Sequence, residues 1–186
     1  IENLYLNDKS FTIYPFAFSN FSGNLYLSGL STLTKEPNAY YIGGVQYFKN
    51  FEGNLFLEGE VSQNLASYLG DLNENATIYC EGKYIDIIRK YWAGNIESTT
   101  PCWISERETG YTTVSFSLDS NIESLLESAE VYFNGTKLNP INGRYQIKDL
   151  VPDSKYDIEI QYHNTEGNTT VVTDYIETLS VLGRVS

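Results

Sequence analysis

Two stretches in the first half of the chain carry the same alternation of apolar and polar residues. Phe18 to Gly29 reads FSNFSGNLYLSG, and it recurs 30 residues later as FKNFEGNLFLEG, from Phe48 to Gly59. Within each copy a Gly-Asn turn precedes leucines that alternate with other residues, which is the period of a half-buried strand. A third fragment, Asn3 to Leu6, matches the middle of the pattern. One structural unit is therefore expected to be used two or three times.

The pattern predicts further elements and a boundary between two domains. A helix is expected over residues 63–69, with Ser62 as its N-cap and Gly70 as its end. Loss of the Tyr- and Ile-rich pattern over residues 95–101 predicts the boundary. The expected organisation is a Tyr-rich β-domain over 1–97, a second β-domain over 98–180 and a tail over 181–186. Additional strands are predicted at 11–16, 40–47, 77–80 and 83–88, the last two joined by a turn at Glu81-Gly82.

The most specific local motif lies in the second half, at Leu150-Val-Pro-Asp-Ser-Lys-Tyr156. Pro152 fixes φ and prevents strand pairing, so this segment is expected to turn a corner. Tyr156 then buries its ring and returns its hydroxyl to the backbone across that corner. The alternating run over residues 156–162 that follows is typical of a strand.

The pattern Leu-x-Pro-x-x-x-Tyr, carried by Leu150, Pro152 and Tyr156, resembles the corner between strands E and F of fibronectin type III domains. The resemblance covers about residues 100–180 and implies an immunoglobulin-like sandwich of about seven strands. Phe116 stands where the family usually has a core Trp, and Trp103 is expected to cover that end of the core. Asn134-Gly135 predicts a type I′ hairpin. The strands implied are B at 111–118, C at 129–133, its hairpin partner at 136–138, E at 144–148 and G at 169–178.

Composition supports strands and excludes some partners. The 16 Tyr and 9 Phe, with many turn-forming Asn and Gly, favour an all-β fold with two β-rich domains. A net charge of -12 repels nucleic acid and anionic membrane surfaces, and no apolar run is long enough to span a bilayer. We therefore expect neither nucleic acid nor membrane as a partner.

The chain begins at Ile1 and contains no Met, so we expect it to be a segment of a longer protein. Its two cysteines, Cys80 and Cys102, fall in different predicted domains. Free buried thiols are therefore expected rather than a disulfide. No signal for a secretory leader is present in the printed chain.

Candidate catalytic and metal-binding patterns are weak, so no enzyme, cofactor or metal is predicted. The single His163 has no Cys or carboxylate at ligand spacing, and a solvated loop histidine is expected. Asp71 to Asn75 begins like a calcium loop, but Ala76 and Gly82 replace the required Gly and Glu. Two pairs of acids at spacing two are interpreted as solvated strand faces: Glu58 with Glu60, and Glu106 with Glu108.

The aromatic residues of the first half are the one feature with a functional interpretation. Exposed rings stack on sugars or supply rigid contact area for proteins, whereas packing between strands is the structural alternative. The candidate glycan or protein contacts are Tyr14, Tyr26, Tyr40, Tyr41, Tyr47 and Phe56.

Two functions remain open at this point. The first is a non-catalytic structural or adhesive segment of an extracellular or virion protein, such as a bacteriophage tail or appendage, that contacts other subunits or copies of itself. The alternative is a carbohydrate-binding and spacer region of a secreted or surface bacterial protein that binds or degrades glycans. Resemblance of domain type supports the first only by association.

Overall fold

The computed structural model describes residues 2–7, 17–28 and 47–181. The chain divides into two compact units, Ile1–Thr99 and Thr100–Ser186. The predicted strands at 11–16 and 40–47 lie outside the described residues, apart from Tyr47. Among the described helices, none has both the length and the apolar character needed to cross a bilayer.

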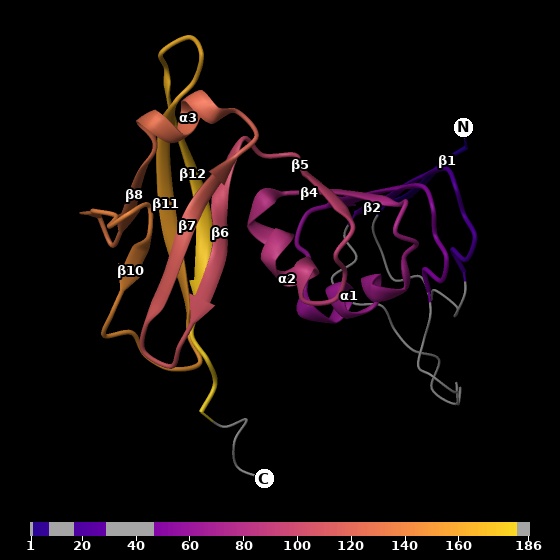
Figure 1. Ribbon diagram of the computed structural model, residues 1–186, viewed down its shortest axis with the longest axis horizontal. Helices are drawn as coiled ribbons and strands as arrows, with labels where there is room; N and C mark the ends of the chain where they lie inside the picture. Colours follow the sequence, from indigo (N-terminus) through magenta and orange to yellow (C-terminus); the bar gives the residue numbers. More distant parts are fainter. Residues whose placement is uncertain (1, 8–16, 29–46, 182–186) are drawn as a thin grey trace. The chain divides into compact units, whose positions relative to one another are not determined.

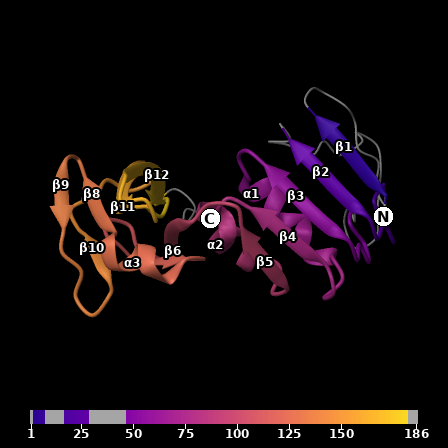
Figure 2. The ribbon, with the colours of Figure 1, turned by 90° about the horizontal axis from the view of Figure 1, so that it is seen from above.

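The first unit is built on a parallel sheet whose strands follow one another in chain order (Figure 2). Each strand pairs with the next at equivalent positions, so Leu25 lies beside Leu55 and Tyr26 beside Phe56. Parallel pairing requires each connection to return the chain to the same end of the sheet. The result is a solenoid-like stack of coils. The strands are β1 (Asn3–Asn7), β2 (Asn24–Ser28), β3 (Asn54–Glu58), β4 (Thr77–Cys80) and β5 (Asn95–Ser98).

One face of this sheet forms the core of the first unit, and short helices lie on that side (Figure 1). Helix α1 (Gln63–Ser67) begins at Ser62, whose Oγ accepts a hydrogen bond from the Leu65 N–H at 3.1 Å. A 3₁₀ turn, η1 (Leu69–Asp71), follows α1. A second 3₁₀ turn, η2 (Gly82–Tyr84), leads directly into helix α2 (Ile85–Arg89). The buried apolar side chains of strands and helices include Leu25, Leu27, Leu55, Leu57, Ile78, Leu65 and Ile88.

Close approach of successive coils explains the Gly-Asn turns of the repeat. The carbonyl of Gly23 accepts a hydrogen bond from the Asn54 N–H at 3.0 Å, and that of Gly53 accepts one from Thr77 at 3.1 Å. A Cβ added to Gly53 would collide with the Gly23 carbonyl oxygen. The repeat also places Asn20 and Asn50 at φ 60° and 58°, a backbone region that Asn tolerates better than most residues.

Two predictions for the first unit need correction. Residues 83–88 form η2 and part of α2 rather than a strand, because β4 is already paired on both edges, with β3 and β5. The two units divide between Thr99 and Thr100, inside the predicted boundary over 95–101, although that range also contains β5. Helix α1 ends at Ser67, and η1 then runs through Gly70. The chain is mostly β, but a parallel sheet with helices replaces the all-β first half.

The second unit is a β-sandwich of a three-stranded and a four-stranded sheet. One sheet has the order β10-β7-β6 and the other β12-β11-β8-β9, which separates expected strands B and E from C, F and G. Helix α3 (Glu123–Ser128) lies at one end of the sandwich (Figure 1). The strands are β6 (Cys102–Thr109), β7 (Val114–Ser120), β8 (Glu130–Phe133), β9 (Thr136–Leu138), β10 (Tyr145–Ile147), β11 (Lys155–His163) and β12 (Thr169–Glu177).

The core between these sheets contains Phe116, whose ring stacks on that of Tyr145 at 5.4 Å. Cys102 and Ile104 of β6 also belong to this core, whereas Trp103 between them does not. The expectation that Trp103 covers one end of the core is therefore wrong. Strand alternation explains it, because neighbouring residues face opposite sides of β6. Asn134 and Gly135 adopt φ 49° and 76°, as the predicted hairpin turn between β8 and β9 requires.

A buried ion pair joins the edge strands of the two sheets, β6 and β12. Arg107 Nη2 donates to Asp174 Oδ1 at 2.8 Å, and the exposed fractions of the two side chains are 9% and 4%. Asp174 also accepts from the Ile104 N–H at 2.8 Å, and Arg107 Nε donates to the Tyr175 carbonyl at 3.2 Å. These bonds run from β6 in one sheet to β12 in the other. The ion pair therefore closes one side of the sandwich.

Replacing Gly53 with Ala should destabilise the first unit. The added methyl forces β3 away from the preceding coil, so the free energy of unfolding of this unit should fall by about 2 kcal/mol. Urea titration followed by hydrogen exchange of peptides from residues 47–99 measures it. The neighbouring Glu52→Ala is the control, because that side chain is exposed. Equal stability of the two variants would contradict the close stacking.

Replacing Asp174 with Asn should destabilise the second unit by about 3 kcal/mol, because Arg107 then stays buried without its counter-charge. Lys137→Ala removes the exposed pair with Glu130 at 3.1 Å and should cost less than about 1 kcal/mol. Urea denaturation followed through exchange of peptides from residues 102–178 compares the two. A cost for Asp174→Asn no greater than that of the control would show that the buried pair does not hold the sheets together.

Candidate functional site

The outward face of the parallel sheet carries a continuous row of stacked aromatic rings. Ring centroids are 4.4 Å apart between Tyr5 and Tyr26, 4.3 Å between Tyr26 and Phe56, and 4.5 Å between Phe56 and Tyr79. The rings of each pair lie within 12° of parallel. Because the strands are in register, the middle residue of each strand repeats at the spacing between strands, which places one ring directly against the next.

An asparagine ladder runs beside the ring row. The Asn24 Nδ2 donates to Asn3 Oδ1 at 2.8 Å, and the Asn54 Nδ2 donates to Asn24 Oδ1 at the same distance. Thr77 takes the equivalent place on β4 and accepts from Asn95 Nδ2 at 3.3 Å. These bonds hold each side chain in one orientation. The two rows are therefore ordered and carry no charge themselves, but Glu97 lies beside Tyr79 on β5 and Glu58 shares the outward face of β3 with Phe56.

Stacking decides what the ring row presents to a ligand. Each face of Tyr26 and Phe56 is covered by a neighbouring ring, so only ring edges and hydroxyls point away from the sheet. Sugars bind aromatic residues through the ring face, whereas protein side chains also pack on edges and hydroxyls. The pKa of Tyr26 is raised, first by desolvation and then by the adjacent Tyr5. The geometry of the row suits a protein contact better than a glycan.

The predicted contact residues separate into three groups. Tyr26 and Phe56 lie in the ring row. Tyr47 is fully buried, with its ring edge-on to Tyr68 at 4.9 Å, so its assignment to a contact surface is wrong. This Tyr precedes the repeat and packs inward with Phe48, which is also fully buried. Tyr14, Tyr40 and Tyr41 lie outside the described residues.

Sequence reasoning missed two members of the row, Tyr5 and Tyr79. The signal for Tyr5 was present, because Asn3 to Leu6 repeats the strand pattern. Tyr79 lies between the buried Ile78 and Cys80 and has the same alternation, but Thr77 replaces Asn and no Gly-Asn turn precedes it. The asparagine ladder was also missed, since the repeat alone does not show that its copies pair side by side.

The corner of the second unit places Leu150, Pro152 and Tyr156 around one hydrogen-bonded turn. The Tyr156 hydroxyl accepts from the Val151 N–H at 2.8 Å, and its half-buried ring lies edge-on to Phe133 at 5.8 Å. Leu150 is buried and Pro152 half-buried. These contacts stabilise the turn.

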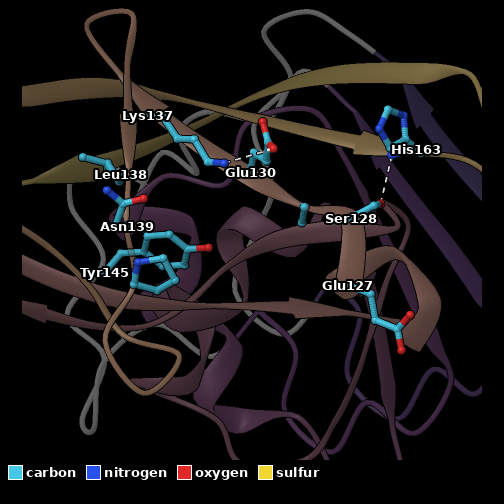
Figure 3. Close-up of a pocket in the computed structure, with 10 residues that line it drawn as sticks. Glu127, Ser128, Glu130, Lys137, Leu138, Asn139, Tyr145 and His163 are labelled. Carbon is cyan, nitrogen blue, oxygen red and sulfur yellow. Dashed lines mark hydrogen bonds and ion pairs between the residues drawn. The ribbon is translucent and has the colours of Figure 1, made fainter.

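A shallow, open hollow of about 390 Å³ lies in the second unit between α3, β8, β9 and the end of β11 (Figure 3). Glu130 accepts from Tyr132 at 2.6 Å and from Lys137 at 3.1 Å, and these bonds, Tyr132 first, lower its pKa. The ring Nδ1 of the exposed His163 lies 3.2 Å from the Thr169 Oγ1. The backbone N–H of His163 donates to Ser128 Oγ at 3.1 Å. The acid and the histidine thus already have partners within the unit.

Metal-binding and paired-acid patterns do not assemble into a site over the residues that the structure describes. Within those ranges no three His, Cys, Asp or Glu side chains are close enough to hold a metal ion. In the segment that begins like a calcium loop, Asn73 Oδ1 accepts from the Asn75 N–H at 2.9 Å and so forms a turn. Glu106 and Glu108 lie at a bulge of β6 beside Arg144, where both are exposed.

Comparisons with known proteins assign neither a family nor a function to this chain. No family model matches the chain, and no curated protein matches it. Among solved structures, the fibronectin type-III domain of human fibronectin type III domain containing protein 3 is 17% identical over 48% of this chain and 96% of its own, with a TM-score of 0.30. FN3tt is 18% identical over 42% of this chain and 88% of its own, with a TM-score of 0.28.

Both thiols should be unreactive in the folded protein at pH 8. Burial raises the pKa of Cys80 to about 12 and that of Cys102 to about 11, so almost no thiolate is present. Ellman's reagent should therefore label neither cysteine until urea unfolds the chain. Because the raised values favour folding only while the unfolded thiols stay protonated, stability should fall as pH rises from about 9 towards 11 to 12. Rapid labelling of native protein would contradict this burial.

Proposed function

We propose that this chain is a non-catalytic structural or adhesive segment of a larger extracellular or virion protein, such as a bacteriophage tail or appendage. The observation that carries the proposal is the outward face of the parallel sheet, with its ring row and asparagine ladder. Parallel sheets are usually covered on both faces, whereas a solenoid leaves one face open for contacts. An ordered, largely uncharged face of this kind binds at low cost in side-chain entropy.

The second unit supports the same function as a spacer or docking module. We propose that it belongs to the fibronectin type III family, on the corner at Leu150, Pro152 and Tyr156 and on the separation of its strands into two sheets. Sandwiches of this kind occur in many proteins of unrelated function, so its contribution to the functional proposal is by analogy.

The glycan-binding alternative has weaker support from the same surface. A glycan-binding row needs open ring faces side by side, but Tyr26 and Phe56 cover each other. Only the two end rings have a face without a neighbouring ring: Tyr5, which is 60% exposed on the edge strand, and Tyr79, which has Glu97 of β5 beside it. Protein partners, including other copies of this chain, are therefore the preferred occupants.

Sedimentation velocity over roughly 1 to 300 µM, together with a glycan array, tests the two functions. We expect the wild type to self-associate with rising concentration and to bind no glycan. The double variant Tyr26→Ser/Phe56→Ser removes the centre of the row and should weaken association at least about tenfold, or about 1.4 kcal/mol. Val171→Ser, an exposed change in the second unit, is the control and should have no effect.

A monomer at every concentration that binds a glycan, with binding lost in Tyr26→Ala, would replace the proposal with the alternative. A monomer that binds no glycan would contradict both. The folded state of each variant is checked by circular dichroism, so that loss of association is not confused with loss of the sheet.

A further inference from the structure

The outward face of the parallel sheet carries acidic side chains beside its ring row. Glu58 of β3 and Glu97 of β5 are exposed, and each alternates with the inward-facing residues of its strand. Neither carboxylate forms an ion pair with a described residue. The five strands contain no Lys or Arg. The face therefore combines aromatic rings with negative charge, and it suits a partner surface that is apolar and basic.

A surface of that kind lies along α2, on the side of the first unit that faces away from the sheet (Figure 1). Ile88 is fully buried against the core, whereas Lys83 and Ile87 are half-buried and Lys90 is exposed. Spacings of four and three residues place Lys83, Ile87 and Lys90 on one side of a helix. We call these three residues the basic stripe.

The two lysines are the available charges of this helix. Neither Lys83 nor Lys90 forms an ion pair with a described residue, and the Lys83 ammonium lies 5.6 Å from the centre of the Tyr84 ring. Asp86, the one acid of α2, already interacts within the chain. Arg89 donates to a backbone carbonyl of the following loop. The stripe therefore presents positive charge on both sides of an apolar centre.

The acids of the sheet and the lysines of the stripe are separated by similar distances. Glu58 and Glu97 lie two strands and two residues apart, which is roughly 12 Å between Cα atoms. Lys83 and Lys90 lie seven residues apart along a helix, or roughly 11 Å. Rings of β3 and β4 lie between the acids, as Ile87 lies between the lysines. The two surfaces match in charge, in spacing and in their apolar centres.

We propose that the outward face of one copy of this chain binds the basic stripe of the next copy, with Glu58 and Glu97 each opposite one lysine. The inference rests on the proposed function, since it names the partner of the same sheet face. Because the two surfaces lie on opposite sides of one unit, the contact is heterologous and repeats from copy to copy, as a ring or a filament. Pairing of two outward faces would instead bring like charges together.

Charge reversal on each surface of the full chain tests this contact. Glu58→Lys/Glu97→Lys makes the outward face basic, and Lys83→Glu/Lys90→Glu makes the stripe acidic. Each change places like charges together, so sedimentation velocity should show half-association at a concentration at least about tenfold above that of the wild type. The variant with all four substitutions exchanges the charges and keeps the net charge at -12, so its association should return to within about threefold of the wild type.

The matched control is Glu123→Lys/Glu127→Lys, on exposed positions of α3 in the second unit. Like Glu58→Lys/Glu97→Lys, it raises the net charge by four units, from -12 to -8. Because weaker net repulsion favours assembly, the control should associate at least as strongly as the wild type. Circular dichroism checks that each variant is folded.

Three results would overturn the proposal. The first is unchanged association in either double variant of the two surfaces. The second is a variant with all four substitutions that associates more weakly than both double variants, because the exchanged charges would then not face each other. The third is association that stops at a dimer, because a contact between opposite sides of the unit continues beyond two copies unless it closes a larger ring.

Two further results separate this inference from the proposed function. If Tyr26→Ser/Phe56→Ser weakens the association of the wild type but Lys83→Glu/Lys90→Glu does not, the outward face binds a different surface and only this inference fails. If the wild type stays monomeric over the whole concentration range, assembly through the outward face fails as well.

Discussion

The first unit depends on one constraint, which is that successive strands pair in parallel and in register. Strands in a sheet lie about 4.7 to 4.9 Å apart, so equivalent residues of neighbouring coils are forced into contact. The stacked rings, the asparagine ladder and the backbone bonds from Gly23 and Gly53 are three consequences of that spacing. Gly is needed where the backbones themselves come closest. A shift of one residue would move the leucines to the outward face and the rings into the core.

The second unit solves a different problem, since its two sheets must stay packed over a core without a solenoid's repetition. Phe116, Ile158 and Ile160 fill that core, and all three are fully buried. At the edge of the core, the ion pair of Arg107 and Asp174 joins the two sheets. Either charge would be costly to bury alone, but each is buried here beside its partner. At the corner, the Tyr156 hydroxyl stabilises the turn by accepting a hydrogen bond from the Val151 N–H.

The proposed function follows from the outward face of the first unit rather than from a reactive group. The asparagine ladder joins β1, β2 and β3, and the ring row runs from β1 to β4. The same geometry argues against sugar stacking on the middle of the row, because rings that cover each other have no free face. The outward face is thus the surface on which the proposed function depends.

The sequence by itself determined the local features that depend on neighbouring residues. Alternation placed Leu25 and Leu27 inward, Ser62 capped α1, Asn134-Gly135 made the hairpin, and the segment from Leu150 to Tyr156 predicted the corner. Tertiary structure decided which strands pair and in which direction. A repeat has the same alternation in a sandwich and in a solenoid. The sequence therefore predicted Tyr26 and Phe56 as contact residues, but it did not predict that their rings stack on each other. Residues 83–88 became helical because both edges of β4 were occupied, and Tyr47 was buried because long-range packing, which alternation does not encode, turned it inward.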